Sequence, residues 1–177
     1  MRAVAMVAHP DDCVIYAYGF IQAHPNLEWT ICYLTHTATD YRGREFFEFW
    51  QRRDKNTVFL GYPDTYQDLL NDQISFDQEE AAQSITSVIK DFDLVLTHNH
   101  HGDYGHPHHK FINQVVCGNH SNVVCFANAG QGTHKYFVEP GSYDLSEFPQ
   151  HRDVVAVVHQ SQHINEYVVT ERVAKIL

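Results

Sequence analysis

The chain has 177 residues, of which 44% are hydrophobic, and these values are typical of a single globular domain spanning residues 1–177. Its 22 Asp and Glu residues outnumber its 12 Lys and Arg residues, which gives a formal net charge of −10. We expect no nucleic acid among its partners, because no basic patch offers counter-charge to phosphates, and no membrane span, because no apolar run approaches the roughly 20 residues of a transmembrane helix.

The N-terminus and the cysteines bear on the cellular compartment. No basic stretch followed by a long apolar one opens the chain, so nothing there indicates a secretory signal. Four cysteines are present without a Cys-x-x-Cys pair, and we expect all of them to be reduced thiols: Cys13, Cys32, Cys117 and Cys125. Reduced thiols are typical of cytoplasmic proteins, and we expect a cytoplasmic localisation.

The first predicted element is a buried strand that ends in a polar loop. Residues 3–7 form a short apolar run without polar alternation, which is the pattern of a strand buried on both faces of a parallel sheet. The loop Ala8-His9-Pro10-Asp11-Asp12 follows directly. In open α/β sheets ligands bind outside the carboxyl ends of the strands, so this loop is a candidate site.

Spacing gives the polar residues of this loop different roles. His9 and Asp12 are three residues apart, close to one helical turn, and can converge on one point while Asp11 is rotated away. An imidazole and a carboxylate suit a divalent cation, and a second carboxylate beside them suits a base acting on bound water. The same residues are as typical of a polar turn whose Asp caps the next helix. A third ligand elsewhere would separate the two interpretations.

The remaining elements alternate between helix and strand. In the first half of the chain we predict a helix at 14–23, a strand at 27–35, a polar loop at 36–44 that supplies one wall of the site, a helix at 45–60 that stops at Gly61, and a short strand at 62–66. A helix at 76–90 capped by Ser75, a strand at 92–97 and a helix from His106-Pro107 to about Gly118 follow. The last predicted elements are strands at 122–127 and 136–139, a helix at 150–162, and a strand or short helix at 166–176. This order predicts an α/β fold, a three-layer, Rossmann-like, mainly parallel sheet flanked by helices.

A histidine-rich stretch follows the strand predicted at 92–97 and contains six of the 14 histidines: His98, His100, His101, His106, His108 and His109. His106 and His109 are three apart at the start of a helix, so both can face one crevice, whereas His108 should point elsewhere. One histidine of this pair would complete a three-ligand zinc set with His9 and Asp12. We interpret the other four histidines as a solvated polar loop or an adventitious metal-binding surface.

Two motifs together resemble a known family. The pairing of AHPDD after the first strand with YGHPHH after a later one resembles the LmbE-like proteins, the PIG-L type zinc-dependent de-N-acetylases that act on N-acetylglucosamine derivatives. The segment FDLVLTH and the late segment HQSQ at 159–162 are similar to the family as well. The resemblance covers residues 1 to about 162 and implies an LmbE-like fold.

The resemblance also implies a role for each matching residue. The implied zinc ligands are His9, Asp12 and His109. The implied catalytic residues are Asp11 as the general base, His106 as the histidine that stabilises the intermediate or protonates the amine, and Tyr104 as the residue that polarises the substrate carbonyl.

Three departures from the family pattern bear on function. Cys13 stands where the family usually has Glu, which is consistent with altered support of the site or with an inert buried thiol. His108 replaces an acidic residue next to the implied ligand. The position of a family arginine falls on Phe49, with Arg52 and Arg53 one turn later, which leaves sugar recognition open.

These observations predict a zinc-dependent N-deacetylase, a hydrolase that removes an acetyl or other acyl group from the amide nitrogen of an amino-sugar-type substrate. Zinc-bound water would attack the carbonyl while Asp11 takes its proton. Fe(II) suits the same ligands. The alternative is a non-catalytic metal-binding or sensing domain. Cys13 and the missing family arginine favour this alternative, and the presence of Asp11, Tyr104 and His106 opposes it. A nucleotide-binding domain is the weakest reading, because the first loop has no Gly-x-Gly.

Several other residues are assigned to structure rather than chemistry. Asp103 is expected in a solvated loop, with the orientation of a ligand imidazole as the alternative, and His159 is expected either near the site or as the cap of a core helix. The aromatic residues expected in the core or a lid are Trp29, Phe46, Phe47, Phe49 and Trp50.

Overall fold

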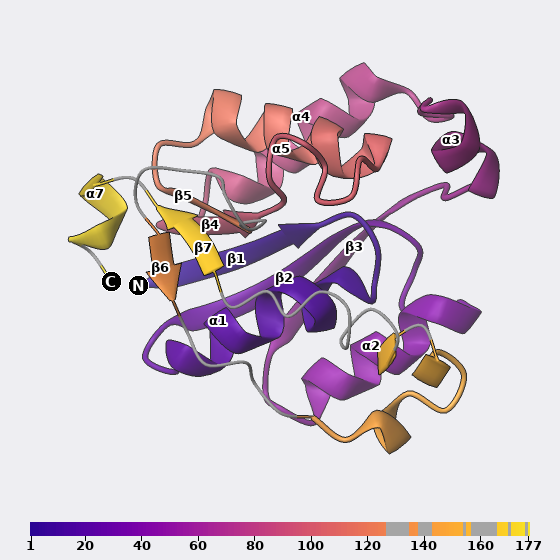
Figure 1. Cartoon of the computed structure of the whole chain (residues 1–177), viewed down its shortest axis with the longest axis horizontal. Coiled ribbons are helices and arrows are strands. Elements are labelled where there is room, and N and C mark those ends of the chain that lie inside the picture. The colour runs from indigo at the N-terminus through magenta and orange to yellow at the C-terminus, as the bar shows by residue number, and fades with distance from the viewer. Residues whose placement is uncertain (127–134, 138–142, 154, 157–165, 170, 176) are drawn as a thin grey trace.

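The computed structural model describes residues 1–126, 135–137, 143–153, 155–156, 166–169, 171–175 and 177. Within these residues, a seven-stranded sheet carries helices on both faces (Figure 1). In the spatial order β3-β2-β1-β4-β5-β7-β6, the strands are β1 (Arg2–Val7), β2 (Glu28–Thr35), β3 (Asn56–Tyr62), β4 (Leu94–Thr97), β5 (Val123–Phe126), β6 (Lys135–Phe137) and β7 (Glu166–Val169).

The strands that carry the two sequence motifs are neighbours at the centre of the sheet. β3, β2, β1, β4 and β5 are parallel, whereas β7 runs antiparallel to both β5 and β6. In the β1–β4 pair, Met6 is in register with Thr97. Both strands therefore end at the same edge of the sheet, and the loops that follow them lie side by side, as the crevice prediction requires.

The helices form a layer on each face of the sheet. In Figure 1, α1 and α2 lie on one side and α4 and α5 on the other. Successive strand residues alternate between the two layers: Ala5 belongs to the core under α1 and α2, and Met6 to the core under α4 and α5. The helical elements are η1, a π-helical turn (Cys13–Ala17), α1 (Tyr18–Ala23), α2 (Tyr41–Gln51), α3 (Tyr66–Asn71), α4 (Gln78–Ile89), α5 (Pro107–Asn119), the 3-10 turn η2 (Leu145–Glu147) and α7 (Glu171–Ala174).

This arrangement confirms the predicted three-layer, mainly parallel α/β fold. The strands predicted at 3–7, 27–35, 92–97 and 122–127 and the helices predicted at 14–23, 76–90 and 107–118 all form within two residues of their expected ends. β6 covers the first part of the strand predicted at 136–139, and the rest lies outside the described residues. Among the described helices, none combines the length and the apolar character needed to cross a membrane.

The helix predicted at residues 45–60 is wrong at both ends. α2 begins earlier, because the side chain of Asp40 accepts hydrogen bonds from the backbone N–H groups of Arg42 and Gly43 and caps it. Its end is followed by Asp54, whose φ of 53° leaves the helical region. The remaining residues form β3, an edge strand paired with β2, because their run of β-branched and aromatic side chains suits a strand.

Three smaller predictions also differ from the structure. Residues 62–66 are not a strand, because β3 ends there and α3 follows. Asp77 caps α4 in place of Ser75. The segment 166–176 contains both a strand, β7, and a short helix, α7. Most of the helix predicted at 150–162 lies outside the described residues.

Candidate metal centre and its pocket

The loop after β1 folds so that an imidazole and a carboxylate meet. The backbone N–H of His9 donates a 2.7 Å hydrogen bond to Asp12 Oδ2, and His9 Nδ1 lies 3.1 Å from the same oxygen. Both side chains are buried. Asp11 points away from them toward Arg42, as its rotation in the sequence predicts. The chain leaves this loop through the π-helical turn η1, a conformation that is rare and often found at functional sites.

The loop after β4 is held in one tight shape. Gly102 has φ +74°, and a Cβ there would lie 2.6 Å from the carbonyl oxygen of His106, so this position requires glycine. His106 caps α5, because its Nδ1 accepts the backbone N–H of His108 at 3.2 Å. The rings of His106 and His109 then stack one turn apart, with centroids 4.8 Å from each other. The spacing of the two histidines predicts this common orientation.

Three ligand atoms from the two loops meet at one point. His109 Nε2 lies 3.2 Å from Asp12 Oδ2 and 3.2 Å from His9 Nδ1. Zinc bonds of about 2.0–2.1 Å at tetrahedral angles separate ligand atoms by about 3.4 Å, so these atoms fit one small divalent cation. Two imidazoles and a carboxylate suit zinc or Fe(II). The three predicted metal ligands are thus brought together.

Two buried side chains behind this triangle orient its rings. Asp103 Oδ2 accepts hydrogen bonds from His109 Nδ1 at 2.8 Å and from His98 Nδ1 at 2.5 Å. His98 Nε2 accepts the backbone N–H of Ala8 at 3.0 Å and so ties the two loops together. Because Asp103 holds the hydrogen on His109 Nδ1, the lone pair of His109 Nε2 faces Asp12. The prediction that His98 and Asp103 lie in a solvated loop is wrong, since their exposed fractions are 0% and 7%.

His108 is also not a solvated residue that points elsewhere. It is fully buried, its Nε2 lies 2.9 Å from Asp68 Oδ2, and its Nδ1 lies 3.2 Å from His9 Nε2. A histidine run looks polar in a sequence, but a carboxylate partner allows each ring to be buried. His100 and His101 are exposed, as predicted.

Carboxylates dominate the electrostatics of the cluster. Burial opposes charge on His9, but Asp12 and Asp64 outweigh burial and raise its pKa to about 9. Burial would raise the pKa of Asp12, yet His109 and His9 hold it well below its usual value. Burial and the neighbouring ring of His9 lower the pKa of His106 to about 2. The triangle therefore stabilises positive charge, whereas the ring of His106 stays neutral.

Arg42 and Asp64 belong to the site although their spacing in the sequence does not reveal them. Arg42 Nη2 donates to Asp11 Oδ1 at 2.5 Å, and Nη1 donates to Asp64 Oδ2 at 3.1 Å. Asp64 Oδ1 lies 3.5 Å from His9 Nε2. The one signal was the polar loop predicted at 36–44 as a wall of the site, which contains Arg42.

The arginines near the position of the family arginine do not reach the site. Arg52 and Arg53 follow the C-terminal end of α2, and both pair with Glu147. The guanidinium of Arg53 also lies over the ring of Phe49, 3.6 Å from its centroid. These two arginines hold the segment around Glu147 near α2. Arg42 is the arginine that contacts the cluster, through Asp11 and Asp64.

The cluster opens into a pocket of about 250 Å³. Tyr104 lies at its rim with 52% of its surface exposed. Partial desolvation and the carboxylates of Asp12 and Asp11 raise the pKa of Tyr104, so its phenol stays protonated. The pocket thus offers several hydrogen-bond donors, a carboxylate and the rings of two tyrosines beside the ligand triangle. Its lining includes His9, Arg42, Asp64, Tyr66, Tyr104 and His106.

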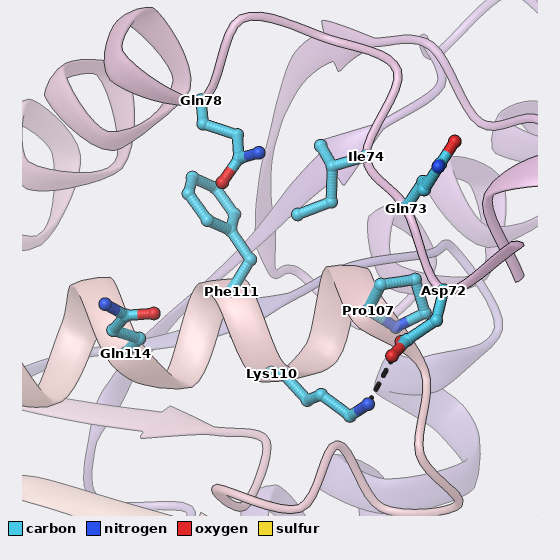
Figure 2. A pocket seen from close by; sticks show the side chains of 8 residues that line it. All are labelled: Asp72, Gln73, Ile74, Gln78, Pro107, Lys110, Phe111 and Gln114. Carbon is cyan, nitrogen blue, oxygen red and sulfur yellow. Dashed lines mark hydrogen bonds and ion pairs between the residues drawn. The ribbon is translucent and has the colours of Figure 1, made fainter.

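A larger hollow of about 500 Å³ lies elsewhere, between α5 and the segment before α4 (Figure 2). Its two charged lining residues, Lys110 and Asp72, pair with each other at 3.1 Å. None of the histidines of the cluster is among its lining residues. Size alone therefore does not mark the functional site in the described part of the chain.

Cys13 faces the core rather than the cation cluster. Its Sγ accepts a hydrogen bond from Trp50 Nε1 at 2.9 Å and lies 3.0 Å from Tyr33 Oη. Burial raises the pKa of the thiol above its usual value, so Cys13 stays protonated and the inert interpretation holds. Phe47 is half-buried, whereas Trp29, Phe46, Phe49 and Trp50 are core residues as predicted. His159 lies outside the described residues.

Comparison with known sequences points to one family. The family model described as PIG-L: GlcNAc-PI de-N-acetylase matches residues 4–119. "Uncharacterized protein L374" of Acanthamoeba polyphaga mimivirus is 26% identical over an alignment of 148 residues, and the match covers 75% of this chain and 64% of that protein. The chain therefore spans slightly less than two-thirds of the length of this relative.

Comparison with solved structures gives the same fold. A deacetylase of the teicoplanin biosynthesis pathway is similar with a TM-score of 0.60 and 15% identity, over 92% of this chain and 85% of that one. The N,N'-diacetylchitobiose deacetylase of Pyrococcus horikoshii gives 0.55 and 16%, over 98% and 73%. GalB, a 4-carboxy-2-hydroxymuconate hydratase from Pseudomonas putida KT2440, gives 0.55 and 14%, over 91% and 79%. Because a hydratase shares this fold, the fold alone does not decide the reaction.

Proposed function

This chain belongs to the PIG-L family of GlcNAc-PI de-N-acetylases, and on that premise we propose that it is a metal-dependent hydrolase that removes an acetyl or other acyl group from the amide nitrogen of an amino-sugar-type substrate. The observation that supports this most is the buried triangle of His9 Nδ1, Asp12 Oδ2 and His109 Nε2, with the carboxylate of Asp11 beside it. A structural polar turn would need none of this convergence.

The residues that would hold a zinc ion are His9, Asp12 and His109. When bound, zinc lowers the pKa of a coordinated water toward about 7 and polarises a carbonyl oxygen as a Lewis acid. Fe(II) would be held by the same set.

Asp11 is the proposed general base. Its ion pair with Arg42 keeps the carboxylate at the edge of the cluster rather than among the ligands. From there Asp11 takes a proton from the attacking water and returns it to the amine as the C–N bond breaks. We assign both proton transfers to Asp11 because the lowered pKa of His106 makes that histidine a poor source of a proton.

His106 and Tyr104 are the proposed donors to the oxygen that becomes negatively charged. His106 Nδ1 already accepts the backbone N–H of His108, so its hydrogen lies on Nε2, and His106 lines the pocket. Removal of a buried donor of this kind typically costs about 10²- to 10³-fold in rate, which is the loss expected for His106, whereas Tyr104 is half-exposed and should contribute less. The protonated phenol of Tyr104 supplies a second donor from the rim.

The lining of the pocket supports a small polar substrate with an apolar face. Arg42 and Asp64 offer a donor and an acceptor for hydroxyl groups, and the rings of Tyr66 and Tyr104 offer flat apolar surfaces. A volume of about 250 Å³ is near the lower end of ligand pockets and suits one sugar unit. We propose a single small-molecule substrate, and the cytoplasmic localisation stays a prediction.

The decisive experiment combines turnover with metal content. Zinc-loaded protein is assayed for acetate release over a panel of N-acylated amino sugars, and we expect turnover of at least one. Asp11→Asn should lower kcat by about 10²- to 10⁴-fold and keep its zinc. Asp91→Asn, the same change at an exposed acid far from the cluster, is the matched control. Full activity of Asp11→Asn would overturn the mechanism.

The alternative, a metal-binding domain without catalysis, predicts no acetate release from any member of the panel. Two sequence features favoured it, the thiol of Cys13 and the displaced arginine. Neither supports it in the folded chain, because Cys13 packs against Trp50 in the core and Arg42 lines the pocket. The hydrolase is therefore the better supported function.

A further inference from the structure

His9 faces a different cluster through each of its ring nitrogens. Nδ1 faces the triangle already described, whereas Nε2 lies 3.2 Å from His108 Nδ1 and 3.5 Å from Asp64 Oδ1. The two partner atoms are 3.9 Å apart. We propose that His108 Nδ1, Asp64 Oδ1 and His9 Nε2 form a second cation site that takes a divalent transition metal such as zinc, next to the first site.

The distances within this second triangle fit metal ligands. Its edges of 3.2, 3.5 and 3.9 Å bracket the separation of about 3.4 Å between ligand atoms on a tetrahedral zinc ion. The neighbouring group of His98, Asp103 and His109 does not fit. One carboxylate oxygen there accepts two hydrogen bonds, at 2.5 and 2.8 Å, which are too short for two ligands of one metal. That group supports the first site, and the His108 group has the spacing of a site of its own.

Asp68 prepares His108 as a ligand. His108 Nε2 lies 2.9 Å from Asp68 Oδ2, and the other oxygen of Asp68 accepts a hydrogen bond from Thr65 Oγ1 at 2.7 Å. Both side chains of this pair are buried. With the hydrogen held on Nε2, the lone pair of His108 Nδ1 faces the second triangle. Asp103 prepares His109 for the first triangle in the same way.

The charge around the two triangles favours bound cations. Five carboxylates set against the guanidinium of Arg42 leave a net charge of −4, and loss of the ring proton of His9 would make it −5, of which two divalent cations would compensate four. Buried carboxylates are costly unless cations or hydrogen bonds compensate them. Four of the five carboxylates are buried, Asp11, Asp12, Asp68 and Asp103, and the fifth, Asp64, is partly exposed.

The second site would act on the pocket directly. His9 and Asp64 both line the pocket beside His106, so a cation held there would occupy the space next to the proposed donor. Binding at both nitrogens of His9 requires its ring proton to leave for solvent, so the second cation should bind more weakly than the first. The regulatory consequence rests on the proposed function: excess zinc would inhibit hydrolysis by filling this site.

The competing role for Asp64 and His108 is to orient His9 by accepting its Nε2–H, in which case one cation binds. Isothermal titration of zinc into metal-stripped protein, with bound metal measured after gel filtration, separates the two. We expect two equivalents in the wild-type protein and one in His108→Gln. The double variant His100→Gln/His101→Gln should keep two, because these exposed histidines would account for adventitious binding. One equivalent in the wild type, two in His108→Gln, or loss of the second in the double variant would overturn the proposal.

A second variant and a second readout keep the test valid if His108→Gln unfolds. Asp64→Asn changes a partly exposed side chain and should also bind one equivalent. Titration with Co²⁺ should add visible absorption in two steps in the wild type and in one step in Asp64→Asn, and two steps in Asp64→Asn would count against the site. Stoichiometry needs no substrate, so a protein that binds two cations and hydrolyses no amide would retain this inference and lose the proposed function.

Discussion

The site has an inner half and an outer half that differ in burial. The side chains of the inner half, Asp12, His98, Asp103 and His109, are at most 7% exposed. The rings of His98 and His109 both donate a hydrogen bond to the carboxylate of Asp103. The outer half, Arg42, Asp64 and Tyr104, is partly exposed and lines the pocket. A cation needs ligands that are held in fixed positions, whereas a substrate needs side chains that are accessible from solvent. We therefore predict that substitutions in the inner half lower metal affinity and that substitutions in the outer half lower turnover.

The largest expected effect is at the inner half. His109→Ala removes one of the three ligands of the first site, so we expect loss of zinc from that site and of all zinc-dependent turnover. At zinc a hundredfold above the Kd of the first site, the wild-type protein should gain about 2.7 kcal/mol of stability from that site, or roughly 5–10 °C in Tm, and the variant should keep only the smaller gain from the weaker second site. His101→Ala, at an exposed histidine, is the control, and the measurement is thermal unfolding with and without EDTA. A zinc-dependent Tm gain as large in His109→Ala as in the wild type would break the comparison.

The next effect concerns His106, which lies where the two halves meet. His106→Asn keeps an acceptor that can cap α5 but does not reach the pocket with an N–H, so kcat should fall by about 10²- to 10³-fold with zinc retained. Because the pKa of His106 is lowered to about 2, its ring should stay neutral, with the hydrogen on Nε2, from about pH 5 to pH 9. Histidine ¹⁵N chemical shifts measure this directly, and a titration near pH 6.5 would contradict the assigned role.

A smaller effect is expected behind the ligands. Asp103→Asn keeps a side chain that tolerates the φ of 62° at this position but weakens the hold on His109, so zinc affinity should fall by about 10- to 100-fold. Competition with a chromophoric chelator measures the change. Once zinc is saturating, kcat should return to the wild-type value. Wild-type affinity in this variant would mean that Asp103 only supports the loop.

The smallest effect is at the rim of the outer half. Tyr104→Phe removes one partly exposed hydrogen bond, so kcat/KM should fall by roughly 2- to 12-fold, the equivalent of about 0.5–1.5 kcal/mol, and zinc affinity should not change. Tyr41→Phe, at an exposed tyrosine outside the pocket, is the control. A change in zinc affinity for Tyr104→Phe would remove the distinction between the two halves.

The order of elements and the local spacing within each motif were readable from the amino-acid sequence by itself. Apolar runs without alternation predicted the central strands, and the three-residue spacing of His9 to Asp12 and of His106 to His109 predicted which side chains share a direction. These features depend on backbone periodicity alone. Neither end of α2 was readable. Its start is set by Asp40, a cap that the sequence analysis did not single out, and its end is followed closely by the apolar run of β3.

Only the tertiary structure decided what surrounds the ligands. Arg42, Asp64 and Asp68 come from segments far from both motifs, and they reach the cluster because parallel strands end at one edge of the sheet. Burial of His98 and His108 was equally hidden, since a histidine is buried or solvated according to whether a carboxylate from another segment meets it. Periodicity specifies the direction of a side chain, and packing across the sheet specifies its partner.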